Sequence, residues 1–250
     1  MTDHEEKLFF DRLSDFIHRV ERDWTTCYSF FLDERQQALA SRFLHQSAFH
    51  HFMLYGGFDQ AGRKVLGLFP EYHEPAGEDF PLHAVTLHYR SVDKPRHQDI
   101  LGTLMGLNIK RELIGDILIG EENAVIFLLE PAHTVVLNEV KKIGRIGVTV
   151  KSGQPAALPN PYTLKPIGGT VSSLRLDCLV AFFTNLSREK ASQLIRSGQV
   201  SVNFFEIDEI SYSVTEGDIF SIRGYGRFVL SHVGGLSQKG RLHLVGHQYV

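Results

Sequence analysis

The amino-acid sequence predicts an α+β protein with more than one domain. Some segments place apolar residues at helical spacing, others alternate them as strands do, and short turn-rich stretches lie between. Residues 153–170 contain four prolines and no periodic apolar pattern, which is typical of a linker. We therefore expect an N-terminal α/β region over residues 1–72, a central domain over 73–152, a proline-rich linker over 153–172 and a C-terminal domain over 173–250.

The N-terminal region begins with an amphipathic pattern. Over residues 5–23 the apolar side chains recur every three or four positions, which predicts a helix. A strand over 28–32, a helix over 34–45 and strands over 51–55 and 64–69 are expected to follow. The last two strands are joined by a loop that contains Gly56, Gly57 and Gly62. The pattern predicts a small α/β region and indicates no role for it.

The central domain shows a clearer order of elements. We expect a strand over 82–89, a helix over 97–107, strands over 114–119 and 124–129, a helix over 133–143 after Pro131, and a strand over 146–150. This order is that of the split βαβ, ferredoxin-like fold, which RNA-recognition motifs share. The third strand, NAVIFLLE, lacks the basic and aromatic residues that stack on bases in those motifs, and Phe127 is expected in the core. The prediction is therefore RNA-recognition-like topology without conventional base stacking.

The C-terminal domain begins with two predicted helices. Leu176, Leu179 and Phe183 give the first helix an apolar face. Ser187 is a favourable N-cap for the second helix, because its hydroxyl accepts a hydrogen bond from an amide of the first turn. Gly198 is expected to end that helix in a left-handed conformation, and residues 199–203 to leave as a strand.

A basic stripe lies along the second of these helices. Arg188, Ser192 and Arg196 are spaced at i, i+4 and i+8, next to the apolar face and toward solvent. Guanidinium groups form paired hydrogen bonds to phosphate oxygens. We therefore predict that Arg188 and Arg196 contact phosphates and do not support the core.

The charges are divided unevenly along the chain. The net charge is −3, yet residues 140–250 contain 13 basic and seven acidic side chains, and no acidic residue occurs from Lys141 to Leu176. A basic C-terminal half attached to an acidic N-terminal half indicates a polyanion partner, most often nucleic acid.

From Ser173 to about Phe228 the sequence resembles the αL RNA-binding motif, also called the S-four domain, of a small-subunit ribosomal protein, tyrosyl-tRNA synthetases and pseudouridine synthases. RLD at residues 175–177, SR at 187–188, LIRSGQVSVN and EGDIFSIRG carry the resemblance. It implies an RNA-binding face made of Arg175, Ser187, Arg188, Lys190, Arg196, Ser197 and Asn203, extended by Arg223 and Arg227. For Asn203 a purely turn-forming role is the alternative, and for Lys190 a solvated position.

A second resemblance covers most of the chain. HQDILGTLMGLNIKRELIGDI, residues 97–117, and VSSLRLD, residues 171–177, resemble the YlmH family of RNA-binding proteins. The resemblance implies a cytoplasmic, monomeric protein that binds ribosomal RNA and tRNA on a large ribosomal subunit carrying peptidyl-tRNA, in quality control of stalled translation. A division-linked regulator is an alternative that the resemblance leaves open. The linker here is proline-rich where the family's is acidic.

An RNA-modifying enzyme is the rival interpretation. RLD also occurs in the active-site motif of pseudouridine synthases, where the aspartate is catalytic, but Asp177 stands at a helix start, where the helix dipole favours an acidic residue. A methyltransferase would need a glycine-rich turn between a strand and a helix, whereas the 56–62 loop joins two strands. We therefore expect no catalytic residue and no small-molecule substrate.

No metal, cofactor or membrane segment is expected. Of the 13 histidines, His50-His51 and the His83/His88 pair are the densest sets, and none has metalloprotease spacing. His97 is expected at a helix start, where a place near RNA is an alternative. The two cysteines are far apart, so a disulfide is not indicated. The apolar runs are too short to span a bilayer, and the N-terminal MTDHEEKLFF is acidic where a signal peptide is basic.

Overall fold

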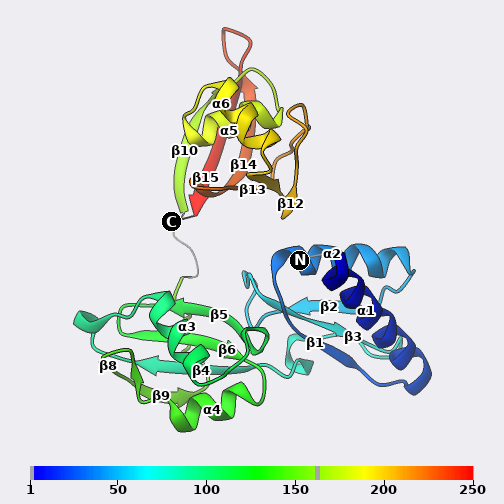
Figure 1. The fold of residues 1–250 in the computed structure, drawn as a ribbon, viewed down its shortest axis with the longest axis vertical. Coiled ribbons are helices and arrows are strands. Elements are labelled where there is room, and N and C mark those ends of the chain that lie inside the picture. The colour runs from blue at the N-terminus through cyan, green and yellow to red at the C-terminus, as the bar shows by residue number, and fades with distance from the viewer. Residues whose placement is uncertain (1–2, 161–163, 250) are drawn as a thin grey trace. The chain divides into compact units, whose positions relative to one another are not determined.

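The computed structural model describes residues 3–160 and 164–249. The chain forms two compact units, Met1–Pro161 and Tyr162–Val250 (Figure 1). Helices and strands are mixed in both units, so the α+β prediction is confirmed.

The first part of the N-terminal unit is a three-stranded antiparallel sheet with two helices. Its elements are α1 (Asp3–Asp23), β1 (Cys27–Leu32), α2 (Glu34–Gln46), β2 (Phe52–Tyr55) and β3 (Lys64–Leu68), and the strand order is β1-β3-β2. Asp33 starts α2 with a capping box: its carboxylate accepts from the Gln36 amide at 2.8 Å, and the Gln36 side chain accepts from the Asp33 amide at 2.9 Å. Leu13, Leu44 and Leu66 form the core between helices and sheet.

The second part of this unit is a four-stranded antiparallel sheet. Its main elements are β4 (His83–His88), α3 (His97–Gly106), β5 (Ile114–Ile119), β6 (Asn123–Leu128), α4 (Ala132–Glu139) and β9 (Thr149–Ser152), and short 3₁₀ turns occupy Gly77–Asp79, Ser91–Asp93 and Arg111–Leu113. The strand order β5-β6-β4-β9 is that of the ferredoxin-like fold. Phe127 is buried, as the sequence predicted.

The end of this domain differs from the prediction. The helix expected over 133–143 ends at Glu139, and the strand expected over 146–150 is displaced to Thr149–Ser152. The intervening residues form a small hairpin in which β7 (Lys142–Ile143) pairs with β8 (Ile146–Gly147). Gly144 adopts φ +58°, a left-handed conformation that glycine reaches readily, and the chain reverses its direction here. The following strand, β9, then pairs with β4.

The two parts of the N-terminal unit share a core and a polar contact. Phe31 of β1 packs in the same hydrophobic cluster as the ferredoxin-like sheet. The Asp116 carboxylate on β5 accepts from the backbone amides of Gly62 and Arg63, and the Arg63 guanidinium donates to the carbonyls of Phe31 and Ile114. The boundary expected between residues 72 and 73 therefore lies inside one compact unit.

The C-terminal unit is a six-stranded antiparallel sheet with two short helices. It contains β10 (Leu164–Val171), α5 (Leu176–Thr184), α6 (Arg188–Arg196), β11 (Val200–Val202), β12 (Phe205–Glu206), β13 (Ile219–Ile222), β14 (Gly226–Leu236) and β15 (Leu242–Tyr249), in the strand order β10-β15-β14-β13-β11-β12. Leu179, Ala191 and Ile195 of the helices meet Phe220 and Phe228 of the sheet in one core.

The linker expected over 153–172 is shorter than predicted. Residues 164–171 form β10, which pairs with β15 along its whole length, and residues 161–163 lie outside the described residues. The composition resembled a linker because β10 is an edge strand, where a proline such as Pro166 is tolerated. Gly169 lies against the Phe182 ring, so a side chain there would clash at 2.9 Å. Val171, only 3% exposed, joins the core.

We expect β10 to be required for the C-terminal unit to fold alone. A fragment of residues 162–250 should unfold cooperatively, whereas a fragment of 173–250 should lose Val171 from the core and expose the edge of β15. Circular dichroism during heating measures this difference. Equal melting temperatures for the two fragments would show that β10 contributes nothing.

Candidate RNA-binding site

The second helix of the C-terminal unit is bounded as the sequence predicted. α5 ends at Asn185, which has φ +57°, and α6 begins at Ser187, whose hydroxyl accepts from the Lys190 amide at 3.3 Å. Gly198 follows α6 at φ +68°. A side chain there would lie 2.3 Å from the Glu206 carboxylate, so glycine is needed both for the conformation and for the space.

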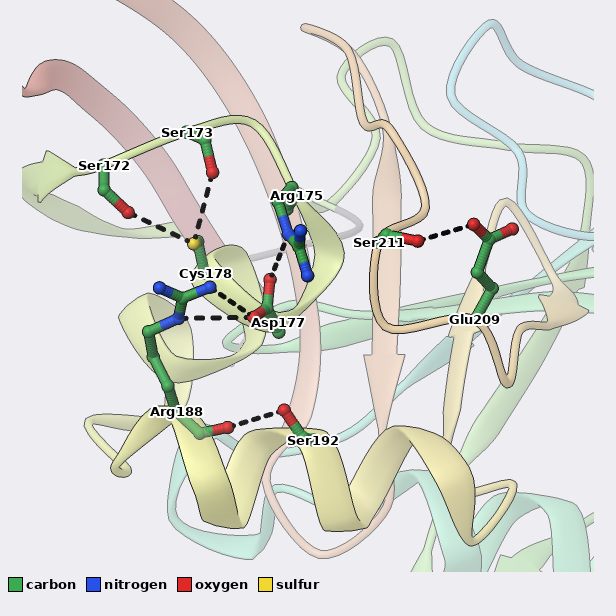
Figure 2. Close-up of polar contacts among 9 residues, drawn as sticks. All are labelled: Ser172, Ser173, Arg175, Asp177, Cys178, Arg188, Ser192, Glu209 and Ser211. Carbon is green, nitrogen blue, oxygen red and sulfur yellow. Dashed lines mark hydrogen bonds and ion pairs between the residues drawn. The ribbon is translucent and has the colours of Figure 1, made fainter.

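A buried carboxylate joins the two helices. Asp177, in the first turn of α5, is 3% exposed. One of its oxygens accepts from Arg175 Nε at 3.1 Å, and the other accepts from Arg188 of α6 through Nη2 at 2.5 Å and Nε at 3.2 Å (Figure 2). The Arg175 and Arg188 side chains are themselves 41% and 57% exposed. Each guanidinium therefore binds Asp177 with one edge and retains N–H donors that face solvent.

This cluster carries a net positive charge. Burial alone would raise the pKa of Asp177, but hydrogen bonds from Arg188 and Arg175 outweigh it and lower that pKa below its usual value. The hydrogen bond to Asp177 raises the pKa of Arg188 in turn. One carboxylate and two guanidinium groups stay ionised near neutral pH, which leaves one excess positive charge at the junction of α5 and α6.

Arg188 lies outside the apolar core, as expected, but it also bonds the buried Asp177 carboxylate, a structural contact that was not expected. Helical spacing correctly placed Arg188 off the apolar face of α6, and it is exposed. The spacing within α6 could not show that this arginine bonds a carboxylate of α5. That carboxylate lies eleven residues earlier in the chain. Its carbonyl also accepts from the Ser192 hydroxyl at 2.8 Å, so Ser192 is occupied within the helix (Figure 2).

Other predicted cations are exposed without a structural partner. Lys190 and Arg196 of α6 and Arg223 after β13 are all exposed, and none of the three makes an ion pair within the described parts of the chain. The backbone amide of Arg223 donates to the Gln199 carbonyl at 2.9 Å, which ties the turn after β13 to the end of α6. Ser197 uses its hydroxyl to donate to the Leu194 carbonyl at 3.0 Å.

The side chains of Asn203 and Arg227, both predicted to bind RNA, also make contacts within the C-terminal unit. Asn203, at φ +48°, donates from its side chain to Asp218 and accepts from the Ile219 amide, so it has the turn-forming role considered as an alternative. The Arg227 guanidinium lies over the Phe204 ring at 5.4 Å and the Tyr249 ring at 6.0 Å. These two aromatic partners are distant in sequence from Arg227, so no local pattern could reveal them.

The two sequence features considered for an RNA-modifying enzyme, Asp177 and the glycine-containing loop, lie in positions that do not favour catalysis. Asp177 is covered and bound by two guanidinium groups, which leave little of its charge for a nucleophilic role. The loop with Gly56, Gly57 and Gly62 joins β2 to β3, as expected, and does not open a helix.

The fold and the charged helix pair define the class: an RNA-binding protein with a ferredoxin-like domain and an αL-type C-terminal unit. Residues 75–156 match the family described as "Putative RNA-binding domain in YlmH". The chain is 34% identical over 242 residues to "Ribosome-associated protein quality control protein P2" of Bacillus subtilis (strain 168), with 95% of this chain and 93% of that protein covered. The chain belongs to the YlmH family, as the sequence resemblance predicted.

A solved structure supports the fold. "Cell division protein ylmH from Streptococcus pneumoniae" matches with a TM-score of 0.54 and 24% identity, over 62% of this chain and 94% of that one. At this identity the match concerns the fold and carries no argument about function. Among the described residues, no helix has the length and apolar character needed to cross a membrane.

We predict that Arg188→Gln destabilises the C-terminal unit by roughly 1–3 kcal/mol, because a buried carboxylate loses part of its hydrogen bonding. Arg196→Gln, the matched exposed change on the same helix, should alter stability by no more than about 0.5 kcal/mol. Urea unfolding of residues 162–250 measures both. In a double-mutant cycle, Arg188→Gln should cost less when Asp177 is already Asn. Equal effects of the two arginine changes would contradict the role of Arg188.

We also predict that Asp177 contributes to the stability of the C-terminal unit at neutral pH and that this contribution is lost in acid. Its pKa is lower in the folded protein than in the unfolded chain, where it is about 3.9. The ion pairs therefore stabilise the fold fully above that value, and this contribution is lost as the pH falls through the folded-state pKa. Unfolding measurements at pH 7, 4 and 2.5 should show the advantage of the natural protein over Asp177→Asn shrinking below about pH 4. An advantage that is independent of pH would refute the assignment.

Proposed function

We propose that this protein binds structured RNA through exposed cations at the start of α5 and along α6, without catalysing a reaction on it. The observation that carries the proposal is the Arg175–Asp177–Arg188 cluster, which holds two guanidinium groups in fixed positions with donors facing solvent. Fixed guanidinium groups lose little side-chain entropy when they bind a phosphate. Lys190 and Arg196 of α6 and Arg223 after β13 add exposed positive charge to the same unit.

The partner that we propose is the large ribosomal subunit carrying peptidyl-tRNA, with contacts to ribosomal RNA and tRNA, in ribosome-associated quality control. The support is family membership and the name of the Bacillus subtilis relative, which describes a ribosome-associated quality control protein. The αL-type geometry fits this target, because a helix pair with projecting guanidinium groups suits the phosphate backbone of folded RNA.

The N-terminal unit is proposed to contribute less to RNA affinity. Two of its arginines, Arg63 and Arg111, direct guanidinium donors to backbone carbonyls inside the unit. Thus these charges serve the fold and leave fewer donors for phosphate.

We predict that Arg196→Gln combined with Arg223→Gln weakens binding to purified large subunits by roughly 2–5 kcal/mol, if each arginine makes one charge-assisted contact. The plot of log affinity against log salt should flatten by about one to two units. Both changes are exposed, so the melting temperature should stay nearly constant. Cosedimentation at several salt concentrations is the measurement.

Arg42→Gln, at an exposed position of α2 in the other unit, is the matched control and should bind like the natural protein. If the double variant binds large subunits with the affinity and the salt dependence of the natural protein, Arg196 and Arg223 do not contact the RNA. A base modification in the bound RNA that depends on the protein would favour the enzyme instead.

A further inference from the structure

Two histidines and a glutamate meet at one end of the ferredoxin-like sheet, outside the helix pair described above. His83 opens β4, Glu130 follows β6, and His133 lies in the first turn of α4. Each offers one ligand atom, and the three atoms lie within 4.8 Å of one another. His133 Nδ1 is 2.9 Å from a Glu130 carboxylate oxygen, and the His83 and His133 rings stack with centroids 4.4 Å apart.

The backbone around this cluster is rigid. His83 pairs with Leu128 in the ladder between β4 and β6, and Glu130 comes two residues after Leu128. On α4, Ala132 and Val136 are almost completely buried, which fixes the helix against the sheet on both sides of His133. The backbone positions of His83 and His133 are therefore set by a paired strand and a packed helix, and Glu130 lies in the short turn between β6 and α4.

The chemistry of the cluster is that of a metal site. Two imidazoles and one carboxylate are the ligands that Zn²⁺ and similar divalent transition metals prefer. Within the described ranges, 3–160 and 164–249, no lysine or arginine forms an ion pair with Glu130. The negative charge of this cluster thus has no permanent cation beside it.

We propose that His83, Glu130 and His133 bind one divalent transition-metal ion, with Zn²⁺ the best match, and that the ion fastens α4 to β4. In a tetrahedral zinc site with bonds of about 2.0–2.1 Å, neighbouring ligand atoms lie about 3.3 Å apart. His133 Nδ1 and the Glu130 oxygen, now 2.9 Å apart, must therefore separate slightly, and the stacked rings must tilt so that both lone pairs point at one ion. Water completes the coordination.

A further contact supports His133 as a ligand. The Ser152 hydroxyl of β9 lies 3.5 Å from His133 Nε2, on the opposite side of the ring from Nδ1. When Nδ1 binds the metal, Nε2 carries the proton and can donate to this hydroxyl. Ligand histidines commonly donate their second nitrogen to an oxygen acceptor in this way.

The expectation of no metal came from the spacing of histidines along single strands. His83 and His88 do not share the cluster, and the partners of His83 come from beyond β6, about fifty residues later. The local signal that could have revealed it is the spacing of Glu130 and His133 at i and i+3 across a helix start.

Titration of the metal-free full-length protein with Zn²⁺ against a chromophoric chelator tests the proposal. One tight site per chain is expected, and Co²⁺ in its place should give the visible absorption of a tetrahedral complex. His83→Ala and His133→Ala should each weaken Zn²⁺ binding at least tenfold, and Glu130→Gln should weaken it less because an oxygen ligand remains. Zn²⁺ should raise the melting temperature of the natural protein but not of the alanine variants.

His88→Ala, at the other end of β4, is the matched control and should bind Zn²⁺ like the natural protein. The proposal is overturned if the natural protein shows no one-to-one binding, if the His83 and His133 variants bind equally well, or if His88→Ala loses the site. Circular dichroism of each variant checks its fold. The Co²⁺ spectrum of the natural protein tests the site even if a variant fails to fold.

Discussion

The C-terminal unit depends on the burial of one carboxylate. A buried charge without partners is costly, so the position of Asp177 in α5 is tenable only where guanidinium groups satisfy both of its oxygens. Arg175 precedes α5 and Arg188 opens α6, so the same ion pairs fix the start of one helix against the start of the next. The helix pair therefore owes its relative orientation to a polar contact as well as to the apolar core of Leu179, Ala191 and Ile195.

This contact links stability to recognition. Arg175 and Arg188 lose their freedom when the unit folds, so little more is lost when they meet a phosphate. The Asp177 carboxylate cancels part of the positive charge of these two arginines. Exposed cations such as Arg196 supply further positive charge on the surface of the unit. A substitution at Arg188 is thus expected to change stability and RNA binding together, whereas substitutions at the exposed Arg196 and Arg223 test the proposed RNA contact without a change in stability.

Local patterns in the sequence predicted most elements but not the contacts between them. The cap at Ser187, the left-handed Gly198 and the ferredoxin-like order follow from residues close together in the chain, and all three are observed. The failures are nonlocal. β10 is a strand only because β15, about eighty residues later, pairs with it, and Arg188 is structural only because Asp177 lies beneath it.

Charged groups that are buried or half-buried have different partners in the two units, and this difference bears on where we propose that RNA binds. In the N-terminal unit the Asp116 carboxylate accepts from backbone amides, and Arg111 donates to a backbone carbonyl, while burial lowers the pKa of Arg111 to about 10. In the C-terminal unit the buried carboxylate is satisfied by guanidinium groups that reach the surface. A carboxylate held by backbone amides brings no cation to the surface, whereas one held by arginines positions two cations there. The second arrangement satisfies a buried carboxylate and presents two fixed cations at the surface, which is why we place the proposed phosphate contacts in the C-terminal unit.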